Sequence, residues 1–307
     1  MHKIYQQTLL NPITFTGIGL HSGKNSKITV FPGNDNQGIV FKRIDLKQNN
    51  IVKAHYKNVS SARLCTTLEN EQGVKVSTVE HLLAALYITG IDNAIIEIDN
   101  EEVPIMDGSA KDFLNVLNKT KIKLLSSKRK YLRVLNKVEL ADGTRKISIE
   151  PNETFEVDFQ LDYKNKIIGK QRNVINFADG KLEEVTESRT FCLFEDIEKI
   201  KKSGLAKGGS LDNAIVVDQD KVLNEGGLRN QKEFVNHKIL DLAGDFLLSG
   251  HRILGKVNCY QGGHELTNMF LRKILSSKLV LESVELEVIE ISKKISSGEP
   301  IKLAVSA

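Results

Sequence analysis

Residues 233–248 read EFVNHKILDLAGDFLL. His237, Asp241 and Asp245 recur at every fourth position of this stretch, which places them on one stripe of a predicted helix. Apolar residues occupy much of the remaining helix surface: Phe234, Val235, Ile239, Leu242, Phe246 and Leu247. Because an unpaired carboxylate is costly in a low-dielectric environment, the stripe must be solvated, paired or coordinating a cation. A solvated edge or a simple Asp–His hydrogen bond is the ordinary explanation of such a spacing.

A second stretch, STVEHLLAAL at residues 77–86, predicts a helix over 77–88. Ser77 and Glu80 have the spacing of a capping box, in which Glu80 only reaches back to a backbone N–H group. The alternative is chemical. Neighbouring helical side chains diverge by about 100°, so His81 can bind a metal while Glu80 faces a water molecule on it. Two neutral imidazoles and one carboxylate suit Zn²⁺ with an open fourth position.

Two glycine-rich stretches remain. QGGHELTN at 261–268 places His264 in a turn before a helix predicted over 267–275, where we expect the side chain to be exposed and mobile. Asp245 is the natural partner to orient this imidazole and to favour its charged form. GIGLHSGK at 17–24 has neither of the glycine spacings of phosphate-binding loops, so it predicts a turn that joins two strands.

Hydrophobic periodicity elsewhere predicts an α+β chain in two halves. The first half has predicted strands at 28–30, 39–41 and 94–98 and a helix at 112–117. The second has strands at 138–140, 146–149, 155–161 and 253–260 and a helix at 195–202. Residues 125–130 interrupt the periodicity, and we expect a domain boundary there. VEHLL at 79–83 and VNHKI at 235–239 are weakly similar, which favours a duplicated unit with one histidine per copy and a site between the copies.

Composition excludes several classes of protein. A chain of 307 residues with 40% hydrophobic content is long enough for two domains with cores of their own. The three cysteines show no C-x-x-C spacing, so we expect a reducing cytoplasm and no thiolate metal site. No apolar run approaches the roughly 20 residues of a membrane helix, and the first residues show no export signal. Net charge of +4 and one short basic cluster at 121–130 exclude nucleic acid as a partner and allow at most transient contact with a membrane surface.

Seven motifs together resemble one known family. They read TGIGLHSG, STVEHL, PIMDGSA, SRTF, GGS, HKILDLAGD and GH, at residues 16–23, 77–82, 104–110, 188–191, 208–210, 237–245 and 263–264. The resemblance, which runs from Thr8 to Leu303, is to the bacterial UDP-3-O-acyl-N-acetylglucosamine deacetylases of lipid A biosynthesis in Gram-negative bacteria. It implies two similar α+β domains, at 1–126 and 131–307, each a sheet layered against helices, with the active site in the cleft between them.

The same resemblance implies the chemistry of the site. Zn²⁺ is held by His81, His237 and Asp241, and Glu80 takes a proton from the water on the metal. It also implies that Thr190 and the zinc stabilise the oxyanion, and that His264, oriented by Asp245, is the cationic electrophile or acid. The acetamide at C2 of the sugar is hydrolysed to acetate and a free amine. Glu80 and His264 remain alternatives for the proton donor to that amine, and we favour Glu80.

Substrate contacts are implied residue by residue. Some positions match those that hold the sugar, the diphosphate or other parts of the substrate: Phe191, Asp196, Lys238, Leu64 and Cys65. Asp162 and Tyr163 are expected near the uridine. An apolar passage for the acyl chain is expected around Ile197, Leu205, Ala206, Ser210 and Val216, for which core packing is the alternative. Gln261 stands where a basic residue is expected, which puts one diphosphate contact in doubt.

The implied partner is a small nucleotide-sugar lipid precursor, and we expect a monomer. Two rival functions stay open at this point: a metal hydrolase that acts on another substrate, and a binding module in which the zinc is only structural. Replacing Glu80 by Gln separates the enzyme from the binding module, because only an enzyme loses turnover while it keeps its zinc.

Overall fold

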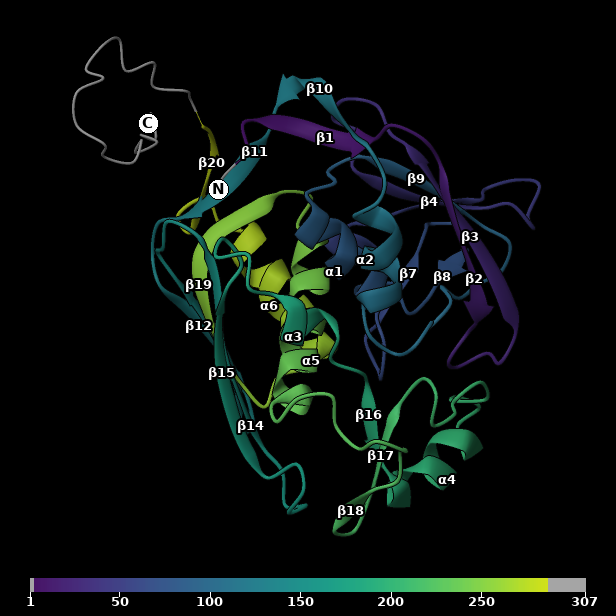
Figure 1. Ribbon diagram of the computed structural model, residues 1–307. Helices are drawn as coiled ribbons and strands as arrows, with labels where there is room; N and C mark the ends of the chain where they lie inside the picture. Colours follow the sequence, from purple (N-terminus) through teal and green to yellow (C-terminus); the bar gives the residue numbers. More distant parts are fainter. Residues whose placement is uncertain (1–2, 287–307) are drawn as a thin grey trace, which may run out of the picture.

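The structure is a computed structural model that describes residues 3–286. Residues 1–2 and 287–307 of the two predicted domains, with Leu303 at the end of the resemblance, lie outside this range. The first half contains a five-stranded sheet of order β2-β3-β9-β4-β5 (Figure 1). Its strands are β2 (Ile13–Ile18), β3 (Asn25–Pro32), β4 (Ile39–Arg43), β5 (Ile51–Lys53) and β9 (Ala94–Ile98). Its helices are α1 (Glu80–Thr89) and α2 (Lys111–Leu117).

The second half contains a seven-stranded sheet in which β19 is central. The strands are β11 (Lys130–Val134), β12 (Val138–Asp142), β13 (Arg145–Glu150), β14 (Phe155–Asp162), β15 (Lys170–Asn176), β19 (Arg252–Tyr260) and β20 (Leu281–Glu285). Its long helices, α5 (Glu233–Leu247) and α6 (His264–Leu275), pack on one another and against this sheet. The smaller helices are α3 (Glu183–Thr186), α4 (Phe194–Lys202) and the 3₁₀ helix η1 (Tyr56–Asn58). One three-stranded sheet consists of β6 (Val59–Ser61), β7 (Thr67–Glu69) and β8 (Lys75–Val76). The other consists of β16 (Phe191–Leu193), β17 (Ile215–Asp218) and β18 (Lys221–Val222).

The two large sheets repeat one topology. In the first, β9 runs antiparallel to β3 and parallel to β4, and the hairpin partners β2 and β5 lie outside them. In the second, β19 runs antiparallel to β13 and parallel to β14, with β12 and β15 outside. Each central strand follows a long helix, α1 or α5, and precedes another, α2 or α6. The weak similarity of residues 79–83 and 235–239 therefore reflects a repeated unit, and the predicted α+β fold of two similar parts is confirmed.

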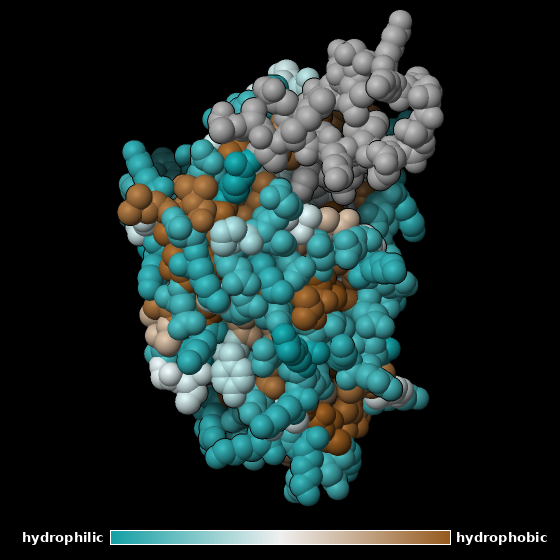
Figure 2. Space-filling view, turned by 90° about the vertical axis from the view of Figure 1, so that its left-hand side faces the viewer, coloured by the Kyte–Doolittle hydropathy of each residue, from teal (hydrophilic) through white to brown (hydrophobic). Residues whose placement is uncertain are grey.

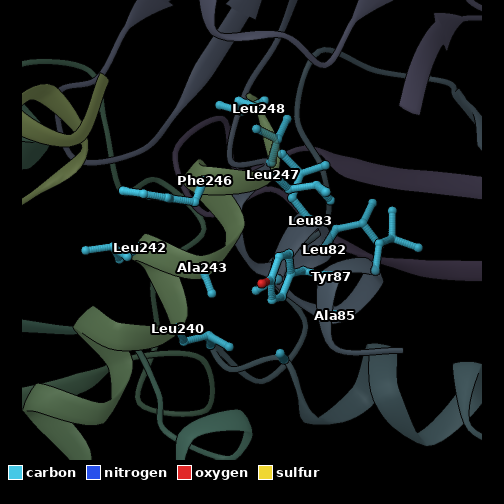
Figure 3. Packing of buried hydrophobic residues seen from close by; sticks show 14 of the residues in the cluster. Leu82, Leu83, Ala85, Tyr87, Leu240, Leu242, Ala243, Phe246, Leu247 and Leu248 are labelled. Carbon is cyan, nitrogen blue, oxygen red and sulfur yellow. The ribbon is translucent and has the colours of Figure 1, made fainter. Parts of the chain in front are cut away.

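Helices α1 and α5 pack directly on one another (Figure 3). The labelled side chains in this view include Leu82 and Leu83 from α1 and Leu240 and Ala243 from α5, all buried in one core that extends through both halves. Gly244 is the point of closest approach, because a Cβ atom there would lie 2.1 Å from the backbone oxygen of Glu80. The fold thus holds the two helices that carry the predicted metal ligands in contact.

Residues 125–130 lie where the chain passes from one sheet to another. They lie in β10 (Ile122–Lys128), which pairs with β1 (Tyr5–Leu9), and at the start of β11, which pairs with β19 and β20. The apolar periodicity is interrupted here because β10 is largely exposed, and a strand without a buried face needs no apolar alternation. The chain changes sheets at Arg129.

The predicted helix over 77–88 begins later, at Glu80. Ser77 bridges to Glu102, and Thr78 has a φ of 56°, so the chain enters α1 through a turn rather than a capping box. The helix predicted from residue 267 instead begins at His264, after Gly263 in extended backbone. The turn predicted over residues 17–24 is present but shorter, because Gly17 and Ile18 end β2 and residues 19–24 join it to β3. Within residues 3–286, no helix is long and apolar enough to cross a membrane, and the face in Figure 2 is mostly hydrophilic with separate hydrophobic areas.

Candidate active site

Three side chains meet where α1 crosses α5. The Nε2 atoms of His81 and His237 lie 3.4 Å and 3.3 Å from Oδ1 of Asp241. One ligand atom from each residue falls within 4.8 Å of the others, and all three residues are buried. His81 comes from the first half of the chain, whereas His237 and Asp241 stand one turn apart on α5. The sequence prediction that these three residues come together is therefore met.

The donors are arranged as a metal site requires. Nδ1 of His237 lies 3.0 Å from the backbone oxygen of Ser188, so its N–H donates there and the lone pair of Nε2 faces Asp241. Oδ1 of Asp241 is buried and has no hydrogen-bond partner among the described residues, although its other oxygen accepts from Lys238 at 2.8 Å. A buried carboxylate oxygen that faces two imidazole nitrogens fits a divalent cation.

Electrostatics favour the ligand forms of these groups. Burial lowers the pKa of His237 to about 3, so its imidazole is neutral. Burial alone would raise the pKa of Asp241, but His237 and Lys238 outweigh it and hold this pKa well below its usual range. A neutral imidazole and an ionised carboxylate are the forms that bind a metal. The alternative of a solvated helix edge is wrong, because the stripe packs against α1 and α6.

Glu80 points toward the same place. Its Oε2 accepts from the backbone N–H of Thr66 at 3.1 Å, and its Oε1 lies 3.6 Å from Nε2 of His264. The capping-box interpretation is wrong, because no side chain caps α1 and Glu80 is the first residue of that helix. Burial raises the pKa of Glu80, although the nearby imidazoles of His264 and His81 oppose the shift. A carboxylate with a raised pKa beside a metal site is suited to accept a proton.

His264 is buried, with 8% of its surface exposed, and opens α6. The prediction of an exposed, mobile side chain was wrong because Asp245 holds the ring, with Nδ1 2.7 Å from Oδ2. Burial alone would lower the pKa of His264, but Asp245 and Glu80 outweigh it and raise the pKa to about 9. The ring is therefore an imidazolium at neutral pH, and its Nε2 lies 3.8 Å from Oδ2 of Asp241.

A small cavity connects these groups. Its volume is about 20 Å³, and its lining includes Glu80, the three candidate ligands, His264, Lys238 and Thr190. Four residues, Leu20, His21, Leu64 and Thr190, also line a larger cavity of about 340 Å³. Thr190 thus stands at the junction of the two spaces. The arrangement combines a group that could hold a metal, a carboxylate with a raised pKa and two potential hydrogen-bond donors around one point, which suits hydrolysis of an amide.

The larger cavity has a largely apolar lining between α4 and the loop before β17. Of the residues expected in an acyl passage, four line it: Ile197, Ala206, Ser210 and Val216. Leu205 is half-buried beside them but does not line it. Phe191 also lines this cavity, and its ring centroid lies 6.4 Å from that of His237.

Other predicted contacts are spread around the site. Nζ of Lys238 stands 5.7 Å from the centre of the Phe191 ring, and the centres of the Tyr163 and Phe191 rings lie 5.9 Å apart. Asp196 is half-buried, with its carboxylate 3.7 Å from the ammonium group of Lys199, and it lines neither cavity. Asp162 pairs with Lys170 at 3.3 Å.

Cys65 and Gln261 are the last two residues to which the sequence pointed. Cys65 is buried, and burial raises the pKa of its thiol to about 12. The side chain of Gln261 donates to the backbone oxygen of Asp162. Cys65, like Asp162 and Asp196, does not line either cavity.

Sequence reasoning missed four residues near the site. Thr66 links its two carboxylates, because its N–H donates to Glu80 and its hydroxyl donates to Asp245 at 2.6 Å. Arg189 and Glu233 form a buried ion pair at 2.8 Å that holds the segment carrying Ser188 and Thr190 against α5. His21 lines both cavities. Thr66 and Glu233 make their contacts with residues remote in sequence, so no local spacing pointed to them. His21 and Arg189 lie within the motifs at residues 16–23 and 188–191, which could have pointed to them.

Comparison with known proteins agrees with this geometry. The family model described as UDP-3-O-acyl N-acetylglycosamine deacetylase (LpxC) matches residues 6–276. Among similar proteins are UDP-3-O-acyl-N-acetylglucosamine deacetylases of Idiomarina loihiensis, 39% identical over 97% of this chain and 98% of the relative, and of Pseudoalteromonas translucida, 41% identical over 91% and 93%. That of Pasteurella multocida is 43% identical over 92% and 93%. This chain therefore belongs to the UDP-3-O-acyl N-acetylglycosamine deacetylase family.

Proposed function

We propose that this protein hydrolyses the C2 acetamide of UDP-3-O-(3-hydroxyacyl)-N-acetylglucosamine to acetate and the free amine, an early step of lipid A biosynthesis. The observation that carries the proposal is the buried group of His81, His237 and Asp241 beside Glu80, in a chain of this family. We propose Zn²⁺ as the metal, because two imidazoles and one carboxylate leave a position open for water. Bound there, Zn²⁺ would supply a Lewis acid that lowers the pKa of water and polarises a carbonyl group.

The residues of the chain then divide the remaining work. Glu80 accepts a proton from water, whose oxygen attacks the acetyl carbon, and the hydroxyl of Thr190 donates to the carbonyl oxygen as negative charge develops. The imidazolium of His264, held by Asp245, stabilises the same charge. As the C–N bond breaks, Glu80 returns its proton to the leaving nitrogen. The raised pKa of Glu80 supports this shuttle, because such a carboxyl group holds a proton and releases it readily.

The substrate contacts follow the two cavities. We propose that the acyl chain occupies the 340 Å³ cavity past Leu64, because this cavity meets the metal site at Thr190. Lys238 and Phe191 then contact the sugar and its phosphates. We propose lesser roles for Asp162, Tyr163, Asp196 and Cys65, which line neither cavity, and for Leu205.

We also propose that the site is a cleft between two domains, at 1–126 and 131–307. The change of sheets at Arg129 and the pairing of α1 with α5 support this division. A monomer in the cytoplasm is proposed, and the free thiols of Cys65, Cys192 and Cys259 fit that compartment.

The test is a deacetylation assay with purified protein and UDP-3-O-(3-hydroxyacyl)-N-acetylglucosamine. We expect one acetate per amine released, loss of activity with a chelator, and recovery on addition of zinc. UDP-N-acetylglucosamine without the acyl chain is the matched control substrate and should react at least a hundredfold more slowly. Equal turnover of both sugars would favour a different sugar deacetylase, and activity that survives complete metal removal would refute the proposal.

A further inference from the structure

A third cavity, of about 400 Å³, lies at the seam between the two halves. The first half contributes residues of β1, the loop before β4, and Lys53 to His55, and the second half contributes Leu247 and the segment from Gly250 to Arg252. Among the described residues, none that lines it also lines either cavity of the active site. It meets α5 at the opposite end from His237, about 15 Å along the helix. Its volume is typical of a small-molecule site.

Cations outnumber anions in its lining. Lys53, Arg129, Lys130 and Arg252 carry positive charge, whereas Asp92 is the one carboxylate among the described lining residues. Asp92 is already engaged, since it accepts from Arg129 at 2.6 Å and from Arg252 at 3.4 Å. Within residues 3–286, the ammonium groups of Lys53 and Lys130 have neither an ion pair nor a hydrogen bond. A positive surplus therefore faces the cavity.

Arg252 contributes a positive charge to the lining of this cavity. Its Nη2 is buried and has no hydrogen-bond partner among the residues that the structure describes. The rest of the guanidinium is well held, with Nε directed to Asp92 and Cζ 4.4 Å from the centre of the Tyr87 ring. The guanidinium of Arg252 is therefore fixed in place by Asp92 and Tyr87, and it adds its positive charge to the lining of the cavity.

The pKa values of two histidines in this lining, His55 and His251, are lowered in part by the same positive charges. Burial and then the charges of Lys57 and Lys53 lower the pKa of His55. Burial and then the charge of Lys130 lower the pKa of His251, which Asp92 only partly offsets. Both imidazoles are therefore neutral at pH 7 and leave the cavity to its permanent cations.

We propose that this cavity binds a small compound with several phosphate charges, at a site separate from the one that takes the substrate. Guanidinium and ammonium groups are the donors that phosphate oxygens prefer. These cations come from different parts of the chain. Lys53 belongs to the first half and Arg252 to the second, whereas Arg129 and Lys130 lie where the chain passes from one half to the other. A phosphate compound bridged by these cations stabilises the packing of the halves at the end of α5.

The test uses the zinc-loaded protein and inorganic pyrophosphate as the probe, titrated by calorimetry at constant ionic strength. The double variant Lys53→Gln/Lys130→Gln removes two exposed cations that hold no partner, so it should fold normally and keep its deacetylase activity. Arg252→Lys keeps a charge for Asp92 but removes the planar guanidinium, which binds phosphate oxygens in a fixed geometry. Lys27→Gln, an exposed lysine on β3 outside the cavity, is the matched control.

We expect the wild type and Lys27→Gln to bind pyrophosphate equally and to gain thermal stability from it. The Kd should rise at least tenfold in the double variant and in Arg252→Lys, and their melting temperatures should no longer respond. Pyrophosphate held by the substrate's own site would instead compete with the UDP-sugar and bind the double variant unchanged, and that result overturns the proposal. Heat no greater than that of sodium chloride at matched ionic strength overturns it as well.

Discussion

Replacing Gly244 by alanine should damage the active site more than the fold. Gly244 lies on α5 where that helix touches α1. A Cβ atom there would stand 2.1 Å from the backbone oxygen of Glu80, 2.9 Å from its carbonyl carbon and 3.1 Å from the nitrogen of Ala84. Comfortable contacts between carbon atoms are about 3.5–4.0 Å. The two helices must therefore separate locally by about 1 Å or more, because backbone atoms cannot rotate away.

Two effects on stability oppose one another. An alanine in a helix interior gains about 1 kcal/mol over glycine, and overpacking of a core costs about 1–3 kcal/mol, so the free energy of unfolding should fall by about 0–2 kcal/mol. The site has no such compensation. Glu80 and His81 move with α1 while His237 and Asp241 move with α5, and a 1 Å misplacement costs about 10²-fold in rate.

The assay compares Gly244→Ala with wild type in urea unfolding, zinc affinity by chelator competition, and kcat/KM. Gly263→Ala is the matched control, because a Cβ atom at Gly263 has nothing within 4 Å and its backbone is extended. We expect about a 10²-fold loss of kcat/KM and weaker zinc binding in Gly244→Ala alone. If that variant binds zinc and turns over substrate as wild type does, the close contact of α1 and α5 does not set the site's geometry.

Three further predictions concern single groups. Glu80→Gln should lower kcat by about 10²–10⁴-fold with zinc content unchanged; survival of activity with only a lower melting temperature would make Glu80 structural. Because the pKa of His264 is raised to about 9, kcat/KM should fall as pH rises through about 9 and the imidazolium loses its proton. As pH is lowered, kcat/KM should begin to fall at a pH higher than the ordinary pKa of glutamate, because the pKa of Glu80 is raised. A profile that stays flat from pH 7 to 10 contradicts the role of His264. Glu233→Gln should lower the free energy of unfolding by about 3–5 kcal/mol, measured in urea, because Arg189 then keeps a buried charge without its partner; a loss under 1 kcal/mol would show that this pair is not needed.

Local periodicity singled out the candidate metal ligands, and the resemblance to a known family implied that they form one set. His237 and Asp241 stand one turn apart on a helix whose other positions are apolar, and His81 opens a second apolar helix, so both patterns are visible in a short window. The repeated unit was also visible, though faintly, in residues 79–83 and 235–239. These features depend on neighbours in sequence, which is why they could be predicted.

The features that were missed depend on distant partners. Thr66 binds Glu80 and Asp245 from a loop between short strands, and nothing in its own neighbourhood indicates that role. His264 follows two glycines, which favour a mobile turn, but the carboxylate of Asp245 and burial under α5 and α1 override that preference. Strand β10 has no apolar alternation because it lies at the surface, and its pairing with β1 alone defines it.

The central claim is that two helices from the two halves of the chain hold one divalent metal with His81, His237 and Asp241. X-ray absorption at the zinc edge, on the purified zinc-loaded protein and on His81→Ala and His237→Ala, tests it most directly. The account predicts one zinc per chain in a shell of two imidazole nitrogens and oxygen, with one imidazole lost in either variant. A shell with sulfur, or one that stays the same when both histidines are replaced, would contradict it.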